Sequence, residues 1–409
     1  MRLSGIALRN IFRNKRRSLL SIIALAVAAI AITVFFSLFE GIKTNIRSNS
    51  WDWDAGEVRL RHAEFDRYEY LNPVQYVVTD YRDLVERLRA HPDIGAVSPR
   101  IRVLGAAFRG EQQFATLGLG VDLELEKEFQ DLEQVVAVGR LPRPGTNEAV
   151  IGRGLATDLG VGIGDIVTFL IQTRQRGSNA FTVDVVGLAD FPVPQLNRGG
   201  YLIPIENADR YMRMDGAAGE ILLKGAGGDT GAFADTIRSF VEESGRTELS
   251  VVPWTQVSAG YSYLQTANIV YNIIALIFFL LASTVIISTT MMIIHERTRE
   301  IGTLAAMGMH GRELVRLFFT ESAYLGVIGS FAGVLIGVAI TIPLSRIGID
   351  FGSAMDMVEM DLSNVLYPVL NLRSTVLVFF FGLAVAMVST YPSARRAAKL
   401  RPVEALRAE

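Results

Sequence analysis

The sequence has no cysteine among its 409 residues. This absence excludes disulfides, thiolate metal sites, iron–sulfur clusters and cysteine nucleophiles. The four histidines, His62, His91, His295 and His310, do not stand at the spacing of a metal-binding pair. The sequence also lacks the Gly-x-x-x-x-Gly-Lys-Ser/Thr loop that cradles nucleotide phosphates. We therefore expect no ATP hydrolysis by this chain itself.

The sequence also has no excess of positive charge. Lys and Arg number 40 against 42 Asp and Glu, a net charge of −2, which argues against a nucleic-acid partner. Two motif-like stretches are incomplete. Residues 295–299 begin like a zinc-protease helix but lack the second histidine, and the glycines of 160–165 precede a predicted strand instead of following one. The sequence predicts no catalytic residue, no metal site and no cofactor in this chain.

Half of the residues are hydrophobic, which suggests membrane spans. Long runs without charged residues locate four of them. The first, residues 18–39, is 22 residues without a charge. As a helix it measures roughly 33 Å, enough to cross a hydrocarbon core of about 30 Å. It is longer than the apolar part of a signal peptide, and we expect it to remain uncleaved. The other predicted spans are residues 269–294, 317–345 and 374–394, and the charge-free run of the third begins after Glu321.

Basic residues predict the orientation of these spans. Residues 1–17 carry six basic residues and no acidic one, the 295–316 loop carries four arginines, and residues 395–409 carry five basic residues. The 346–373 loop has two arginines against four acidic residues. By the positive-inside rule, both termini and the 295–316 loop face the cytoplasm, and residues 40–268 lie outside.

The large outer segment mixes strand and helix patterns. Predicted strands are residues 58–62, 114–118, 165–171 and 181–187. Residues 80–90 have the pattern of a helix with Asp80 at its N-cap. Residues 220–252 follow a strand–helix–strand order, which predicts a βαβ unit. A stretch rich in Gly and Pro at 139–147 is a candidate boundary between two subdomains.

The sequence thus predicts an α-helical membrane protein with four transmembrane helices and a large α+β extracytoplasmic domain inserted between helices 1 and 2. The basic N-terminal stretch suits an amphipathic helix at the membrane interface, with a simple basic anchor as the alternative. The predicted segments are an interfacial helix at 1–17, a span at 18–39, the α+β domain at 40–268, a span at 269–294, a cytoplasmic region at 295–316, a span at 317–345, a short outer loop at 346–373, a span at 374–394 and a tail at 395–409.

The 295–316 loop carries the most informative local pattern. Arg297 and Glu300 stand at i,i+3 and can pair on one helical face, while Ile301 and Leu304 form an apolar stripe on another. A short helix of this kind suits the groove of a partner protein. Spacing alone leaves a solvated loop beside the membrane as the alternative.

Two features of the third span also predict a role. Gly329, Gly333 and Gly337 form a small-residue ridge that lets another helix approach closely, with general tolerance of glycine as the alternative. Glu321 is the only carboxylate near the core of a span, about one turn inside the cytoplasmic edge. We expect its side chain to reach the interface. Ion or proton coupling is the alternative, although no basic partner stands within a span.

Five stretches, in this order, resemble the MacB/LolCE/FtsX-type ABC transporter permeases. They are residues 7–20 (the N-terminal elbow), 147–165 (part of the periplasmic core), 296–308 (the ATPase-contacting coupling segment), 321–329 (the start of the third span) and 391–407 (the C-terminal signature). Each is modest alone, but together they extend over nearly the whole chain.

The resemblance implies a multi-pass protein of a bacterial inner membrane that contacts membrane lipid and has its large domain in the periplasm. It implies an ABC ATPase dimer on separate chains, which binds ATP and Mg, and a second permease, identical or homologous. ATP-driven closure of the ATPases would then move the periplasmic domains, a process called mechanotransmission. The implied ATPase contacts are Glu296, Arg297, Arg299, Glu300, Ile301 and Leu304.

Members of this family differ in what the motion does. A separate permease of about 400 residues fits the LolC/LolE type, which releases lipoproteins to a carrier. MacB-type efflux of drugs, toxins or lipids with a periplasmic adaptor is an alternative. FtsX-like signalling to cell-wall hydrolases is another, although the outer segment is long for that plan. The implied periplasmic partner is therefore a carrier, an adaptor or a lipoprotein substrate.

Overall fold

The computed structural model describes residues 15–296, 309–351 and 365–398, together with Gly5, Ala7, Arg9, Ile11, Arg13, Thr298 and Thr303. Its contacts divide the chain into two units. The helical unit contains the described residues up to Thr44, Gln265–Asp350 and those from Val365 onward. The sheet unit contains Asn45–Leu264 and Phe351. The divisions fall within the helices α2 (Lys15–Asn49) and α12 (Ala259–Glu296).

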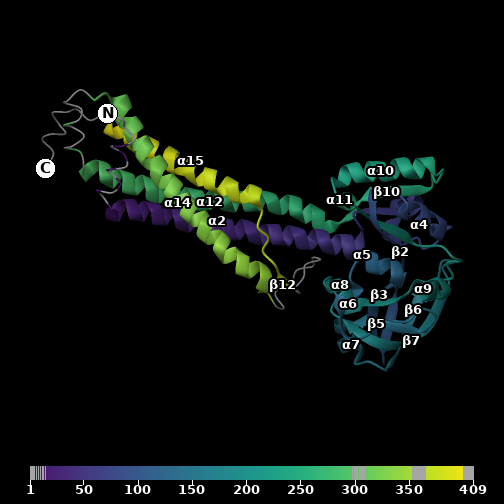
Figure 1. Ribbon diagram of the computed structural model, residues 1–409. Helices are drawn as coiled ribbons and strands as arrows, with labels where there is room; N and C mark the ends of the chain where they lie inside the picture. Colours follow the sequence, from purple (N-terminus) through teal and green to yellow (C-terminus); the bar gives the residue numbers. More distant parts are fainter. Residues whose placement is uncertain are drawn as a thin grey trace. The chain divides into compact units, whose positions relative to one another are not determined.

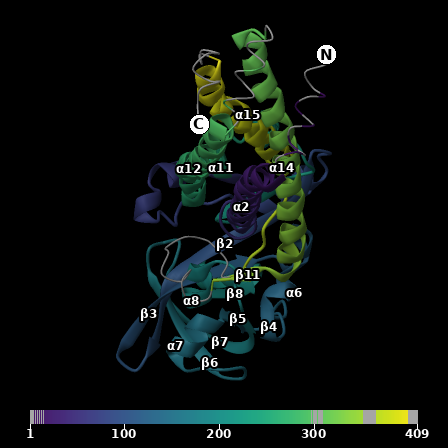
Figure 2. The same cartoon turned by 90° about the vertical axis from the view of Figure 1, so that its left-hand side faces the viewer.

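The helical unit packs four long helices side by side (Figures 1 and 2). They are α2, α12, α14 (Gly311–Ile347) and α15 (Leu372–Ala397), with a short antiparallel pair of β11 (Ile349–Asp350) and β12 (Val365–Leu366). One buried cluster joins Leu25 of α2, Ile286 of α12 and Ala386 of α15. These residues lie on three helices far apart in sequence, so tertiary packing holds the unit together.

Among the described residues, three helical segments are long and apolar enough to cross a membrane: Ser18–Asp54, Gly311–Ile347 and Leu372–Arg396. The predicted spans 18–39 and 374–394 fall within the first and the third, and the predicted span 317–345 falls within the second. Helix α12 contains the predicted span 269–294 but is not among the three. The number of four membrane spans therefore stays a prediction.

The sheet unit is built on one mixed sheet, ten-stranded within the described residues, in which β10-β1-β9-β2-β3-β8-β5-β7-β4 follow one another and β6 pairs with β2 and β7. Its strands are β1 (Val58–His62), β2 (Ile94–Arg109), β3 (Gln112–Val121), β4 (Val136–Gly139), β5 (Glu148–Gly152), β6 (Ile166–Gln172), β7 (Ser178–Ala189), β8 (Gly200–Pro204), β9 (Glu220–Gly225) and β10 (Leu249–Pro253).

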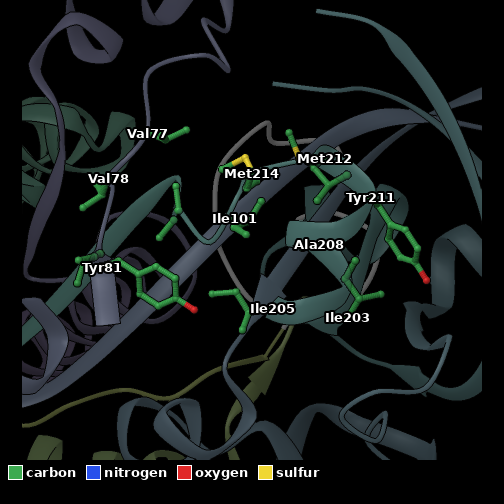
Figure 3. Packing of buried hydrophobic residues seen from close by; sticks show 14 of the residues in the cluster. Val77, Val78, Tyr81, Ile101, Ile203, Ile205, Ala208, Tyr211, Met212 and Met214 are labelled. Atoms are coloured by element: carbon green, nitrogen blue, oxygen red, sulfur yellow. The ribbon is translucent and has the colours of Figure 1, made fainter. Parts of the chain in front are cut away.

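Short helices cover this sheet. They are the π-helical turn η1 (Ser50–Asp54), α3 (Ala63–Arg67), the 3-10 turn η2 (Glu69–Leu71), α4 (Tyr81–Arg89), α5 (Leu123–Phe129), α6 (Leu132–Val135), α7 (Arg153–Leu159), α8 (Pro194–Gly199), α9 (Ile205–Met212), α10 (Thr230–Glu243) and α11 (Trp254–Val257). Figure 3 shows Tyr81 of α4, Ile101 of β2 and Ala208 of α9 in the main core. The burial of these apolar side chains stabilises the sheet unit by about 25 cal/mol per Å² removed from water.

The predicted local elements largely agree with the structure. The strand 58–62 is β1, and the other three predicted strands overlap β3, β6 and β7. The glycine-rich stretch before β6 is a turn, with Gly160 at φ +67° and Gly164 at φ +91°. Helix α4 follows Asp80, but the expected capping bond is absent, because Asp80 has a left-handed backbone (φ 50°) and its side chain caps nothing.

The predicted βαβ unit is present in a different form. Strand, helix and strand occur in the predicted order as β9, α10 and β10. However, β1 lies between β9 and β10 and is antiparallel to both, so the unit is split by a third strand. The stretch 139–147, predicted to separate two subdomains, joins β4 to β5 within the same sheet.

Candidate functional site

Most of the predicted ATPase-contacting residues lie outside the part of the chain that the structure describes. Glu296 is the last residue of α12. Arg297, Arg299, Glu300, Ile301 and Leu304 lie outside the described residues. The contact of this segment with an ATPase therefore stays a prediction.

The predicted glycine ridge faces helix α2. A Cβ built on Gly329 would lie 2.8 Å from Leu25 Cβ. On Gly333 it would lie 2.5 Å from the carbonyl oxygen of Ala26, and on Gly337 2.8 Å from Thr33 Cβ. Real Cβ atoms do not approach other atoms so closely. Helix α14 therefore lies against α2 at a separation that only glycine allows at these positions.

Hydroxyl pairs join other helices of the same unit. Ser322 of α14 and Thr390 of α15 lie 2.6 Å apart, and Ser283 of α12 lies 2.7 Å from Ser389 of α15. Glu321, next to Ser322, is 6% exposed and lies on the buried side of α14. The role predicted for Glu321 at the membrane interface stays a prediction. Single serines in apolar runs carry no sequence signal of pairing, so residue spacing does not predict these contacts.

The sheet unit holds a row of buried arginines. Arg59 of β1 and Arg100 of β2 alternate with the core residues Leu60 and Ile101, so they lie on the opposite face of the sheet. Arg59 is 3% exposed and Arg100 is fully buried. Buried charge of this kind requires partners.

Arg100 has its partners on helix α5 and in the chain segment before β1. Its Nη2 lies 2.5 Å from Glu126 Oε1, and both side chains are fully buried. Its Nε donates to Ser98 Oγ at 3.0 Å, and Ser98 donates to the other oxygen of Glu126. Nη2 also donates to the carbonyl oxygen of Asp52 at 2.6 Å. One arginine thus joins β2 to helix α5 and to the segment that enters the sheet.

That entering segment, residues 50–57, is held by further ionic contacts. The Asp52 carboxylate pairs with Lys224 Nζ of β9, and the Asp54 carboxylate lies 3.2 Å from Arg102 Nη2 of β2. The Glu57 carboxylate accepts from Thr230 Oγ1 at 2.8 Å and from the Gly225 N–H at 3.0 Å. We call the set Asp52, Asp54, Glu57, Arg100, Arg102 and Lys224 the junction clamp.

Apolar contacts reinforce the junction clamp. Trp53 is 5% exposed and packs edge-to-face on Phe191, with ring centroids 5.2 Å apart. A backbone hydrogen bond adds to this contact. The main-chain N–H of Trp254 donates to the carbonyl oxygen of Glu57 at 3.1 Å and joins the end of β10 to the start of β1. Stretching residues 50–57 away from β2 and β9 would therefore break several partly buried contacts.

Electrostatics keep the arginine-rich face charged. Burial alone would raise the pKa of Glu220, but Arg102, Arg59 and Arg61 hold that pKa below its usual value. Burial lowers the pKa of Arg59, and an arginine remains protonated at any physiological pH. For Arg102, burial opposes the charge, but Glu220 and Asp54 raise its pKa overall. The ion pairs therefore persist across the physiological range.

Two protein-family models match most of this chain. Residues 18–240 match the MacB-like periplasmic core domain, and residues 272–402 match the FtsX-like permease C-terminal domain. The lipoprotein-releasing system transmembrane protein LolC of Xylella fastidiosa is 24% identical, and the alignment covers 99% of this chain and 98% of LolC.

A macrolide export ATP-binding/permease protein MacB of Chlorobium luteolum is 25% identical over 98% of this chain but only 59% of that relative. Among solved structures, the periplasmic region of MacB from Actinobacillus actinomycetemcomitans is 13% identical, with a TM-score of 0.35, and covers 49% of this chain and 89% of that structure. The periplasmic core match alone extends over more than half of the sequence. The chain belongs to the MacB/LolCE/FtsX-type family of ABC transporter permeases.

Proposed function

We propose that this chain is the membrane subunit of an ABC transporter that works with a separate ATPase to extract or release lipoproteins or other amphiphiles on the periplasmic side of a bacterial inner membrane. The observation that carries the proposal is the similarity to LolC, a protein named for lipoprotein release, over nearly the full length of both chains. In this proposal both termini face the cytoplasm, and the sheet unit is periplasmic.

The junction clamp supports a role in mechanotransmission. Helix α2 ends at Asn49, and the clamp begins three residues later at Asp52. A displacement that reaches residues 50–57 is passed to β2 through Arg100 and Arg102, and to β9 through Lys224. The junction clamp thus connects residues 50–57 firmly to the sheet, and mechanotransmission to the whole sheet unit requires such a connection.

A second candidate is MacB-type efflux, which the match to the Chlorobium luteolum protein favours. That relative is named as an ATP-binding/permease protein, and this chain spans 59% of its length. In this case the ATPase would be supplied in trans, and an adaptor would bind the sheet unit.

The first test is affinity purification of the tagged chain from its native membrane, with mass spectrometry of the proteins that accompany it. An ATPase together with a second, different permease supports the release-type proposal. An ATPase with this permease alone, together with a periplasmic adaptor, supports the efflux alternative. The absence of any ATPase contradicts both.

The predicted coupling segment is tested in the same experiment. Replacement of Glu300 and Leu304 by alanine should reduce the co-purifying ATPase at least tenfold, about 1.4 kcal/mol or more of binding free energy. The matched control is Glu243→Ala, an exposed position at the end of α10 in the sheet unit. Equal ATPase recovery with both variants would refute the assignment of Glu300 and Leu304 to the ATPase contact.

A further inference from the structure

Two sets of contacts hold α2 against α14 and α15. The first is the glycine ridge of α14 described above. The second is the segment 367–371, which joins β12 to α15 and crosses α2. The Val369 N–H donates to the carbonyl oxygen of Ser37 at 2.8 Å, and a Cβ on Gly41 would overlap the carbonyl oxygen of Tyr367. Because backbone lies directly on backbone here, α2 has no room to shift against this segment.

Helices α14 and α15 approach each other in the same way. A Cβ on Gly326 of α14 would lie 3.0 Å from Ala386 Cβ, and a Cβ on Gly382 of α15 would overlap the hydroxyl of Ser330. Twelve residues of α14 are buried. Such close contacts interlock the helices, so α2, α14 and α15 form one rigid group. We call these three helices the fixed block.

Helix α12 packs differently. Its only glycine, Gly260, stands near its N-terminal end, where a Cβ would lie 2.5 Å from Ile46 Cγ2 of α2. From residue 265 onward, Ala275 and Ile286 are the only buried residues among the described side chains of α12. The close approach of α12 to α2 is therefore confined to one end of the helix.

Side chains make the other contacts of α12 with the fixed block. The ring centroid of Tyr271 lies 3.6 Å from that of Phe39 and 5.0 Å from that of Phe35. The Ser283 hydroxyl lies 2.7 Å from the Ser389 hydroxyl of α15. Side chains can change rotamer and form such contacts again, whereas backbones in contact at a glycine cannot adjust. Helix α12 can therefore leave the fixed block at a smaller cost than α2, α14 or α15.

The loosely packed end of α12 is also the end that leads to the predicted ATPase contacts. Glu296 is the last residue of α12 and the first of those contacts. It lies 36 residues after Gly260, roughly 54 Å along a helix that rises 1.5 Å per residue. A helix that is pinned at one end and loosely packed at the other can swing about the pinned end.

We propose that α12 is the movable helix of the helical unit. Its C-terminal half swings away from the fixed block and returns, while its N-terminal end stays against α2. The mobility of α12 is argued from the packing alone. The further step, that an ATPase drives the swing, rests on the proposed function.

Distances between spin labels test the mobility without any ATPase, because the chain has no cysteine of its own. The first pair is Met292→Cys on α12 with Tyr391→Cys on α15, at positions that are 56% and 49% exposed. The matched pair is Arg316→Cys on α14 with the same Tyr391→Cys. Double electron–electron resonance on the full-length chain in nanodiscs should give a distance distribution about twice as wide for the first pair.

Variants with a single label identify any distances that arise between two copies of the chain. Equally narrow distributions for the two pairs would overturn the proposal, since α12 would then be held as firmly as α14.

Two hydroxyl pairs on adjacent residues of α15 provide matched disulfide locks. Ser283→Cys with Ser389→Cys joins α12 to α15, and Ser322→Cys with Thr390→Cys joins α14 to α15. The hydroxyl oxygens of these pairs are 2.7 and 2.6 Å apart, close to the length of a disulfide bond, about 2.05 Å.

The locks are compared in the complex with the co-purified ATPase. Oxidation of the α12 lock should lower ATP hydrolysis about fivefold, and a reductant should restore it. Oxidation of the α14 lock should leave ATP hydrolysis unchanged, because α14 and α15 do not separate. The complex with the natural cysteine-free chain controls for thiols of the ATPase.

Equal inhibition by the two locks would overturn the division into a movable helix and a fixed block. Full activity with the α12 lock closed would overturn the ATPase-driven swing. If no ATPase co-purifies, the proposed function fails, and the spin-label distances still decide whether α12 is movable.

Discussion

The elements of the two units are held together by different kinds of contact. In the helical unit, α14 approaches α2 through glycines that leave no room for a side chain, and hydroxyl groups pair between helices. In the sheet unit, large apolar side chains form the core, and fully buried ions join the strands to the helices that cover them. The difference follows from the surroundings expected for each unit. Lipid offers no hydrophobic drive for association, so close contact has to supply it, whereas water drives apolar burial in the sheet unit.

The largest expected effect tests whether buried ions hold the sheet unit together. Arg100→Met leaves Glu126 buried without its partner, which should lower the free energy of unfolding of the sheet unit by about 3–5 kcal/mol. Tryptophan fluorescence measures this unit selectively, because the three tryptophans, Trp51, Trp53 and Trp254, all lie within it.

A matched double variant sharpens this test. Arg100→Met combined with Glu126→Leu removes both charges and should recover most of the lost stability, because the penalty of the single variant arises mainly from the unpaired carboxylate. A single variant as stable as the natural chain would mean that these ions are incidental to the packing of the sheet unit.

An intermediate effect is expected at the glycine ridge. Gly333→Leu would place its Cβ 2.5 Å from the carbonyl oxygen of Ala26, so α14 has to move away from α2. Overpacking of this kind typically costs about 1–3 kcal/mol. Thermal unfolding followed by circular dichroism at the helical band should show the loss. Val327→Leu, at a 41% exposed position of the same helix, is the control. Equal stability of the two variants would contradict the conclusion that close contact at the glycines holds α14 against α2.

The smallest expected effect concerns an ion pair near the surface of the sheet unit. The hydrogen-bonded Arg140 guanidinium lowers the pKa of Glu148 from 4.5 to about 2. Because the folded pKa is the lower one, Glu148 stabilises the folded state fully above about pH 4.5, and this contribution is lost as the pH falls toward 2. Since Arg140 is 42% exposed, solvent screens the pair, and Glu148→Gln should lower the fluorescence-detected midpoint by only about 1–2 °C at pH 6. At pH 2 the two proteins should unfold alike. A difference that persists at pH 2 would assign the effect to packing instead of charge.

The sequence predicted local features well where one physical rule dominates. A charge-free run predicts a membrane helix because lipid tolerates few charges, and the run 18–39 lies inside α2. The run does not give the length of the helix, because polar residues up to Asn49 continue the backbone hydrogen bonding.

The sequence could not predict which surfaces the charged residues meet. The alternation in residues 58–62 correctly predicts β1, but alternation defines two faces without telling which of them is covered. Arg61 is buried because Asp66 and Glu69 fold over it and Glu220 arrives from a distant strand. The position of β1 between β9 and β10 is equally non-local and has no signature in the periodicity of the strand itself.

The place of β1 in the sheet also sets an order of events during synthesis. Both of its neighbours come from the far end of the domain, since Val58 pairs with Leu223 and with Pro253. A ribosome therefore releases β1 long before any strand exists to accept its hydrogen bonds, and the waiting strand is open to pairing with other chains. Arg59 and Arg61 alternate with its apolar residues, and such charges discourage strands from aggregating. The arginines that are buried in the finished domain thus protect the nascent strand while it has no partner.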